Sequence, residues 1–257
     1  MCIRDRMISM TDDPSFSYYV YTYYRDICVD DAQNANLVRP YLSIILDHAN
    51  QIIDSYQLDQ PKDSILSFDY SPHFNALNSL FGYFKDSKEV DAYFQRIMNI
   101  SDPNLLVNIV DAMLMRNDEV PLSIYDKITS NPYYWKLLLD AVAYENNLDK
   151  IPAELFTQER TVESILANNV ENYYGHKMID FKIVDTREHT LSDKKLKMYS
   201  FTFNLLDVPD ESYFGMCSQP IDSKPQVTNN YFDYFPRVYE PKKKEEMIAE
   251  FLKIWEE

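Results

Sequence analysis

Hydrophobic residues recur at helical spacing through the first two thirds of the chain. The clearest run begins at Pro40, after which apolar residues stand three or four positions apart, at Leu42, Ile45, Leu46, Ala49, Ile52 and Ile53. This spacing places them on one face and predicts a helix over residues 40–56. Similar runs predict further helices after Pro72, Ser87, Pro103, Pro121 and Pro132 and over 157–169.

Residues 12–30 carry two conflicting signals. Their aromatic residues favour a strand by propensity, at Phe16, Tyr18, Tyr19, Tyr21, Tyr23 and Tyr24. However, residues 12–15 have the composition of a helix start, and four residues fall on one helical face, namely Val20, Tyr24, Ile27 and Cys28. We therefore predict a helix.

Prolines recur near the starts of these segments, 26 to 32 residues apart, at Pro14, Pro40, Pro72, Pro103 and Pro132. Proline suits the first turn of a helix, and a period of this size is typical of stacked helical hairpins. In three units a second proline follows after 18 to 21 residues, at Pro61, Pro121 and Pro152, where we expect the second helix of the hairpin to begin. A non-repetitive helical bundle is the alternative.

The hydrophobic period changes to two after residue 170. Apolar residues alternate with polar ones at Ile179, Phe181 and Ile183 and again at Tyr199, Phe201, Phe203 and Leu205. This alternation predicts two strands, with a polar connection over 186–195 and a third strand near 212–217. We expect an antiparallel meander with one face packed on helices and the other in water.

The predicted fold is mainly α. A HEAT-like α-solenoid of short helical hairpins over 12–169 leads into an antiparallel β cap over 170–222 and an irregular loop over 223–240. An amphipathic helix over 241–257 then packs back on the sheet or serves another neighbour, through the stripe Met247, Ile248, Phe251, Leu252 and Trp255.

Only three glycines are present, where average usage of about 7% would give roughly 18. Phosphate-binding loops, dinucleotide turns and nucleophile elbows need glycine where the backbone turns tightly or approaches a ligand. The sequence therefore lacks these motifs, whereas helical hairpins joined by Asn, Asp and Pro remain possible.

The net charge of −16 argues against nucleic acid as a partner, because phosphate neutralisation needs clustered Lys and Arg. No stretch of about 20 apolar residues occurs, so we expect no membrane span. We predict that Cys28 and Cys217 act as small buried hydrophobic residues, with a disulfide as the alternative. Residues 1–6 resemble translated sequencing-adapter read-through, common in metagenomic reading frames, and suggest that the chain is a fragment.

The titratable residues form no catalytic or metal-binding motif, so we nominate no catalytic, cofactor-binding or metal-ligating residue and no cofactor. His48 stands beside Asp47 on a helix and is expected at the surface. His176 and His189 flank a strand pair with Asp180, Asp185 and Glu188 nearby, where solvated polar residues are the ordinary outcome and a metal site is the alternative. Paired acids such as Asp30 and Asp31 are expected in a chain with 41 acidic residues.

Tyrosine is in excess, with 21 residues, and several of them crowd the first helix. Tyrosine is favoured at interfaces because it offers a large contact area with a polar tip. The tyrosines of residues 18–24 cannot all be buried on one face, so we consider an aromatic surface that contacts an upstream domain. Substitution of Tyr for Phe and Leu in an AT-rich genome is the alternative.

Two stretches resemble the C-terminal region of TraB/GumN-type proteins of Bacteroidetes-like bacteria. One runs from Ile100-Ser-Asp-Pro-Asn104 through residues 119–124 and 147–152 to Thr157-Gln158, and the other is Tyr213-Phe-Gly-Met-Cys-Ser-Gln-Pro-Ile-Asp222. The chain has Cys217-Ser218 where this pattern has a small residue and often glycine. The resemblance implies helical repeats leading into a small β segment, and a cell-envelope or periplasmic location. The hydrolase motifs of that family have no counterpart here, so no catalytic residue carries over.

Together these features predict a non-catalytic protein-interaction or scaffold module from a larger cell-envelope protein, whose partner is an upstream domain or another chain. The alternatives are an accessory domain of a TraB/GumN-type hydrolase whose catalytic part lies outside this chain, and a standalone helical enzyme.

Overall fold

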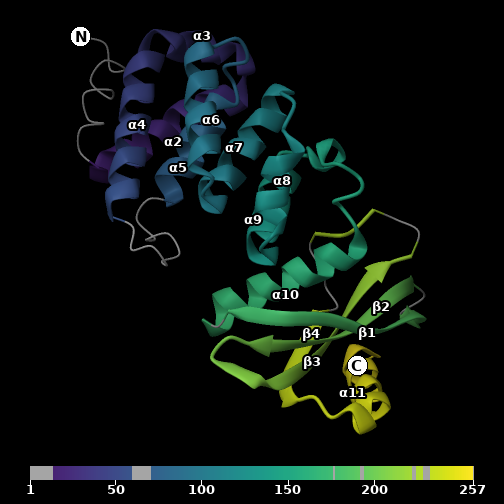
Figure 1. Cartoon of the computed structure of the whole chain (residues 1–257). Helices are drawn as coiled ribbons and strands as arrows, with labels where there is room; N and C mark the ends of the chain where they lie inside the picture. The colour runs from purple at the N-terminus through teal and green to yellow at the C-terminus, as the bar shows by residue number, and fades with distance from the viewer. Residues whose placement is uncertain are drawn as a thin grey trace. The chain divides into compact units, whose positions relative to one another are not determined.

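The computed structural model describes residues 14–59, 71–175, 177–191, 194–221, 224–227 and 232–256. The chain divides into two compact units (Figure 1). Unit 1 comprises residues 1–130 with 144–147, and unit 2 comprises residues 131–143 with 148–257.

Unit 1 is helical throughout its described part. Its elements are α2 (Pro14–Asp30), η1 (Ala32–Asn34), α3 (Ala35–Val38), η2 (Arg39–Tyr41), α4 (Leu42–Asp59), α5 (Ser71–Phe81), α6 (Lys88–Ile100), α7 (Pro103–Arg116) and α8 (Leu122–Thr129). The conflict over residues 12–30 is resolved in favour of helix, because α2 covers that segment from Pro14 onward.

The five periodic prolines lie in the first turns of helices. Pro14, Pro103 and Pro132 are first residues, Pro72 is second in α5, and Pro40 lies in the 3₁₀ turn that leads into α4. This placement confirms the expectation that the periodic prolines stand at helix starts. Proline suits this position because the N–H that it lacks is not used in the first turn of a helix.

The second prolines are less regular. Pro121 is the N-cap of α8, as expected. The expectation for Pro152 was wrong, because Pro152 precedes a turn in which its carbonyl accepts from the N–H groups of Leu155 and Phe156. The next helix starts only at Gln158, with Thr157 as its N-cap. Pro61 lies outside the described residues.

Helices α6 and α7 of unit 1 end without glycine. Ser101 and Asn117 close α6 and α7 in the left-handed conformation, at φ 63° and 62°, and their N–H groups satisfy helix carbonyls. Asn tolerates this conformation because its short polar side chain bonds locally, and Ser101 Oγ donates to the carbonyl of Met98 at 2.9 Å. The scarcity of glycine is therefore compatible with the turns that separate these helices.

The helices of unit 1 pack in a defined order. α5 lies between α2 and α7, α4 contacts α6, and α7 also contacts α6 and α8. α5 and α7 approach closely where Gly82 follows α5, since a Cβ on Gly82 would lie 3.0 Å from the sulfur of Met115. Arg116 at the end of α7 donates to the carbonyl of Lys85 at 3.2 Å, so the C-terminal ends of α5 and α7 meet.

In its described part, unit 2 combines the α-helices α9, α10 and α11 with a four-stranded sheet. Its elements are α9 (Pro132–Tyr144, whose last residue belongs to unit 1), η3 (Leu148–Lys150), α10 (Gln158–Tyr174), β1 (Met178–Leu191), β2 (Lys194–Leu205), β3 (Val208–Pro220), β4 (Phe232–Val238), η4 (Pro241–Lys243) and α11 (Lys244–Glu256). The strands are antiparallel in the order β1-β2-β3-β4. The predicted meander is confirmed.

Two predicted loops contain strand. Within the polar connection expected over 186–195, residues 186–191 and 194–195 instead continue the ladder, in which Thr186 pairs with Tyr199 and Thr190 with Lys195. The sequence did not predict this pairing because the side chains on both strands are polar here. Strands pair through backbone hydrogen bonds, which form whether the side chains are polar or apolar. The irregular loop expected over 223–240 contains β4, which pairs with β3.

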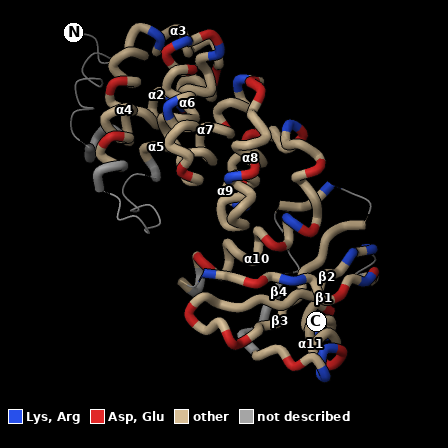
Figure 2. Tube along the Cα trace, viewed as in Figure 1, with Lys and Arg blue, Asp and Glu red and all other residues tan. Residues whose placement is uncertain are grey.

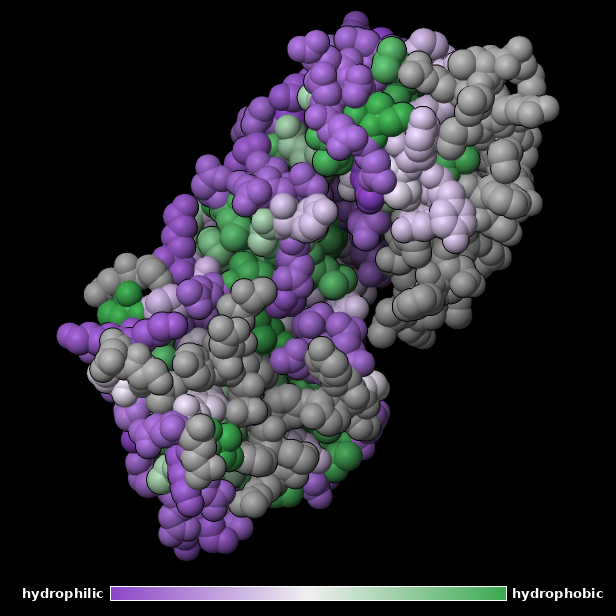
Figure 3. All heavy atoms as spheres, turned by 180° about the vertical axis from the view of Figure 1, so that it is seen from behind, coloured by the Kyte–Doolittle hydropathy of each residue, from purple (hydrophilic) through white to green (hydrophobic). Residues whose placement is uncertain are grey.

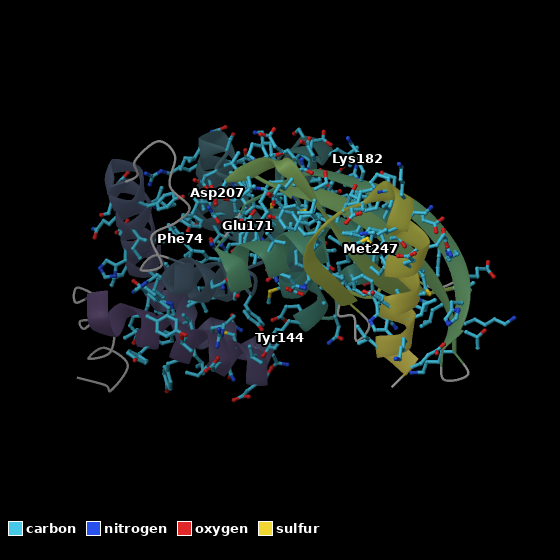
Figure 4. All side chains as sticks on the ribbon, turned by 90° about the horizontal axis from the view of Figure 1, so that it is seen from below. Phe74, Tyr144, Glu171, Lys182, Asp207 and Met247 are labelled. Carbon is cyan, nitrogen blue, oxygen red and sulfur yellow. The ribbon has the colours of Figure 1, made fainter. Side chains whose placement is uncertain are left out.

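The central strands are covered on both faces, which corrects the expectation of one wet face. α10 packs on one face through Val162, Leu166 and Val170, and α11 packs on the other through Ile248 and Phe251 (Figure 1). Met247 of α11 also packs against this second face (Figure 4). The last helix therefore packs back on the sheet, and Ser200 and Thr202 are buried beneath it.

Candidate interaction surface

Helix α2 has a buried side and an exposed side. Tyr21 and Tyr24 are 0% and 1% exposed, whereas Tyr19 is 67% and Tyr23 is 41% exposed. A spacing of four places Tyr19 and Tyr23 on one face of the helix. The prediction that these tyrosines cannot share one buried face is therefore confirmed.

A second exposed stripe follows on the next helical segment. The chain is helical from Ala35 through the 3₁₀ turn to the end of α4, so residues seven apart share a face. Leu37 and Ile44 are 41% and 42% exposed on this face, with the half-buried Tyr41 between them.

Aromatic rings connect the two stripes. The ring centroids of Tyr23 and Tyr24 lie 5.7 Å apart, and those of Tyr24 and Tyr41 lie 6.2 Å apart. The buried Tyr24 thus joins the exposed side of α2 to that of α4. We call the set Tyr19, Tyr23, Leu37, Tyr41 and Ile44 the first-hairpin surface.

Single exposed apolar residues are ordinary on a protein surface, and hydrophobic atoms emerge in several separate groups on the face drawn in Figure 3. The first-hairpin surface differs because its members come from two helices and are joined through a core side chain. Grouped apolar exposure of this kind marks interaction sites.

Acidic side chains flank the first-hairpin surface. Asp26 and Asp30 continue the exposed side of α2 at three and seven residues beyond Tyr23, and Asp47 follows Ile44 by three on α4. Figure 2 shows acidic positions along the trace of α4. Arg25 is half-buried and paired with Asp26 at 2.7 Å. Asp30 and Asp47 have no ion-pair partner among the described residues.

Hydrogen bonds hold α4 in place beneath this surface. Arg96 of α6 donates to the Asn50 side-chain oxygen at 2.6 Å and to the Asp54 carboxylate. The Tyr56 hydroxyl donates to Asp102 at 2.6 Å, and the other oxygen of Asp102 caps α7 by accepting from the Asn104 N–H. Hydrogen bonds therefore attach α4, which carries the exposed Ile44, to α6 and to the N-cap of α7.

The most perturbed carboxyl group of the described chain lies inside unit 1. Asp111 of α7 is 7% exposed, and its Oδ1 atom has no hydrogen-bond partner among the described residues. Burial, followed by the charge of Glu145, raises the pKa of Asp111 to about 7. Asn78 of α5 is 1% exposed and its amide atoms also lack partners there. Asn78 lies one helical turn before Gly82, and Asp111 lies one helical turn before Met115. Gly82 and Met115 are the residues at which α5 and α7 approach closely.

Perturbed pKa values of this kind cluster at functional sites, so the groups around Asp111 matter. Burial and then the charge of Glu145 raise the pKa of Tyr83 to about 12, and burial raises the pKa of the Cys28 thiol to about 11. Both groups are protonated at neutral pH and provide no activated nucleophile. Sequence inspection missed Asp111, although an acid among almost continuous apolar residues of a helix is a signal of burial.

The residues of the second resembling stretch lie mainly on β3 and have structural contacts. The buried Gln219 accepts from the Gln226 N–H at 2.8 Å and donates to its carbonyl at 3.2 Å. The carbonyl of Pro220 accepts from Gln158 at 2.7 Å. These bonds attach the segment after β3 and the start of α10 to the sheet.

The histidines are dispersed. His48 and His73 are half-buried, His189 lies 3.6 Å from Glu256, and His176 lies outside the described residues. Among the residues that the structure describes, no three His, Cys, Asp or Glu side chains are grouped to hold a metal ion. Cys28 and Cys217 are buried, as predicted, and no disulfide joins them.

Within the same described ranges, no helix has the length and apolar character needed to cross a lipid bilayer. No protein-family model matches the chain, and no curated protein or solved structure matches it either. The resemblance to TraB/GumN-type proteins stays a prediction.

Proposed function

We propose that this chain is a non-catalytic protein-interaction or scaffold module whose unit 1 is a short HEAT-like α-solenoid of helical hairpins. The packing order supports the array. In stacked hairpins, first helices contact first helices and second helices contact second helices. The contacts of α5 with α2 and α7, and of α4 with α6, follow this order.

The observation that carries the interaction role is the first-hairpin surface. A terminal helix that only completes a core carries polar residues on its outer side, as capping repeats do. α2 instead exposes Tyr19 and Tyr23, and the helical segment that follows α2 exposes Leu37 and Ile44. Tyrosine supplies large contact area at low conformational cost, which suits a binding surface.

Site-specific photo-crosslinking tests this role. Tyr19→p-benzoylphenylalanine, expressed in cells of the source organism and irradiated, is expected to give one dominant protein adduct of defined mass. Tyr144 is 85% exposed and lies outside the first-hairpin surface, so the same replacement at Tyr144 is the matched control. Equal adduct patterns at both positions, or none at Tyr19, contradict the proposed role of this surface.

A further inference from the structure

We infer that the partner of the first-hairpin surface is an amphipathic α-helix whose apolar side chains are flanked by Lys and Arg. This inference rests on the proposed interaction function and specifies the chemistry of the partner.

The shape of the surface favours a helical partner. The exposed side chains form two helical stripes, one on α2 and one on α3–α4, with the ring of Tyr24 between them. Two such stripes accept the apolar face of a third helix, whose anchors recur at three and four residues. Helix-on-helix packing already operates on the neighbouring sides of the same elements, where α5 contacts α2 and α6 contacts α4. A docked helix continues this established mode of packing.

The charges around the surface favour a basic partner. Asp30 stands in the last turn of α2, near the negative end of the helix dipole, where acidic side chains are unfavourable, and Asp26, which is paired with Arg25, lies one turn earlier. The last turn of α2 contains no basic residue. Asp47 adds a third exposed carboxylate from α4. Lys and Arg beside the apolar anchors of a partner would relieve this repulsion and match the local potential.

The same charges disfavour a second copy of the chain as the occupant. Two copies meeting through this surface would bring their acidic flanks together, and each copy has a net charge of −16. Like charges placed opposite each other across an interface oppose association.

Two synthetic helical peptides test the inference. Each is about 18 residues long, sufficient for measurable helicity, and has the same Leu and Trp anchors. One carries Lys at the flanking positions and the other Glu. Fluorescence anisotropy with the full chain is expected to show binding of the Lys-flanked peptide at least about tenfold tighter than that of the Glu-flanked peptide. The preference should shrink at about 300 mM salt relative to about 50 mM, because exposed charges are then screened.

Paired variants separate the surface from the overall charge of the chain. Tyr19→Ser combined with Tyr23→Ser should weaken binding of the Lys-flanked peptide about tenfold, whereas Tyr144→Ser should leave it unchanged. Asp30→Asn combined with Asp47→Asn should reduce the preference for Lys over Glu several-fold. Asp86→Asn combined with Asp149→Asn removes the same charge from two exposed positions outside the surface and should have a smaller effect. Circular dichroism confirms that each variant is folded.

The outcomes distinguish the partner chemistry from the function. Equal binding of both peptides, reduced by the tyrosine variants, overturns the basic partner and leaves the interaction role intact. Binding of the Lys-flanked peptide that no tyrosine variant reduces is bulk attraction to an acidic chain and overturns both. A dimer in sedimentation velocity that Tyr19→Ser with Tyr23→Ser dissociates identifies a second copy as the occupant and also overturns the inference.

Discussion

Helices α7 and α2 belong to the same unit, but α7 is buried almost all round and α2 on one side only. In α7, Asn104–Val107, Ile109–Leu114 and Arg116 are buried. In α2, the buried side chains Val20, Tyr21, Tyr24 and Cys28 alternate with the exposed Tyr19, Tyr23 and Val29. α7 contacts α5, α6 and α8, whereas α2 contacts α5 and the short helical segments η1 and α3 that directly follow α2. The difference shows that position in the array decides which apolar residues remain available to a partner.

The contrast between α7 and α2 predicts its largest effect on stability at Asp111, the buried acid of α7. Asp111 keeps its proton to about pH 7 in the folded chain, while the unfolded chain releases it near the ordinary value of 3.8. Because the folded state binds the proton more tightly, its stability falls as pH rises between these values, by on the order of 4 kcal/mol. Asp111→Asn should abolish this loss and make the chain more stable than wild type at pH 8. Urea unfolding at pH 5 and pH 8 measures the difference.

Val29→Ala on the exposed side of α2 removes no titratable group, so it is the control and should leave the pH dependence unchanged. An Asp111→Asn variant that loses stability equally at both pH values would show that the carboxylate is stabilising, contrary to the burial argument.

The apolar residues of the two helices should differ by a somewhat smaller amount. Ile109 of α7 is 0% exposed, so Ile109→Ala should cost about 3 kcal/mol through lost burial and the cavity left behind. Val29 of α2 is 57% exposed, and Val29→Ala should change stability by less than about 0.5 kcal/mol. Thermal or urea unfolding compares them. Similar costs for both would mean that α2 is covered on its outer side.

The first-hairpin surface itself should also contribute little to the stability of the fold. Tyr19→Ser with Tyr23→Ser should alter the free energy of unfolding by less than about 1 kcal/mol, since neither side chain is buried. Chemical unfolding of this variant beside Tyr21→Ser checks the point, because Tyr21 is 0% exposed and its loss should be several-fold more costly. A large loss in the double variant would make these tyrosines part of the core.

Local patterns predicted much of the secondary structure. Ser87 caps α6 by accepting from the Val90 N–H, as its position before an apolar run indicated. The helix predicted over 157–169 also starts where expected, with Thr157 as its N-cap. Strand-period alternation placed β1 and β2, but it failed over residues 186–191 and 194–195, where the ladder continues through mostly polar residues. Hydrophobic periodicity indicates which side chains are buried. Paired strands with polar side chains on both faces have no apolar face, so their sequence shows no strand period.

The candidate surface was only partly foreseen. The excess of tyrosine on α2 indicated that some of them must be exposed, because five cannot fit one helical face. The sequence did not indicate that Leu37, Tyr41 and Ile44 would extend the exposed set, since their spacing is equally compatible with a buried face. Nor did it reveal Asp111, whose perturbed pKa arises from the packing of α7 against neighbouring helices.

The sequence by itself determined where most helices and strands begin, because caps, prolines and hydrophobic periods act within a few residues. Only the tertiary structure decided which face of each element is buried. α11 covers the second face of the sheet although it begins 39 residues after the end of β2. α5 begins 41 residues after the end of α2 and packs on α2, in which Tyr21 and Tyr24 are buried. Burial depends on which distant elements meet, and no short stretch of sequence records that.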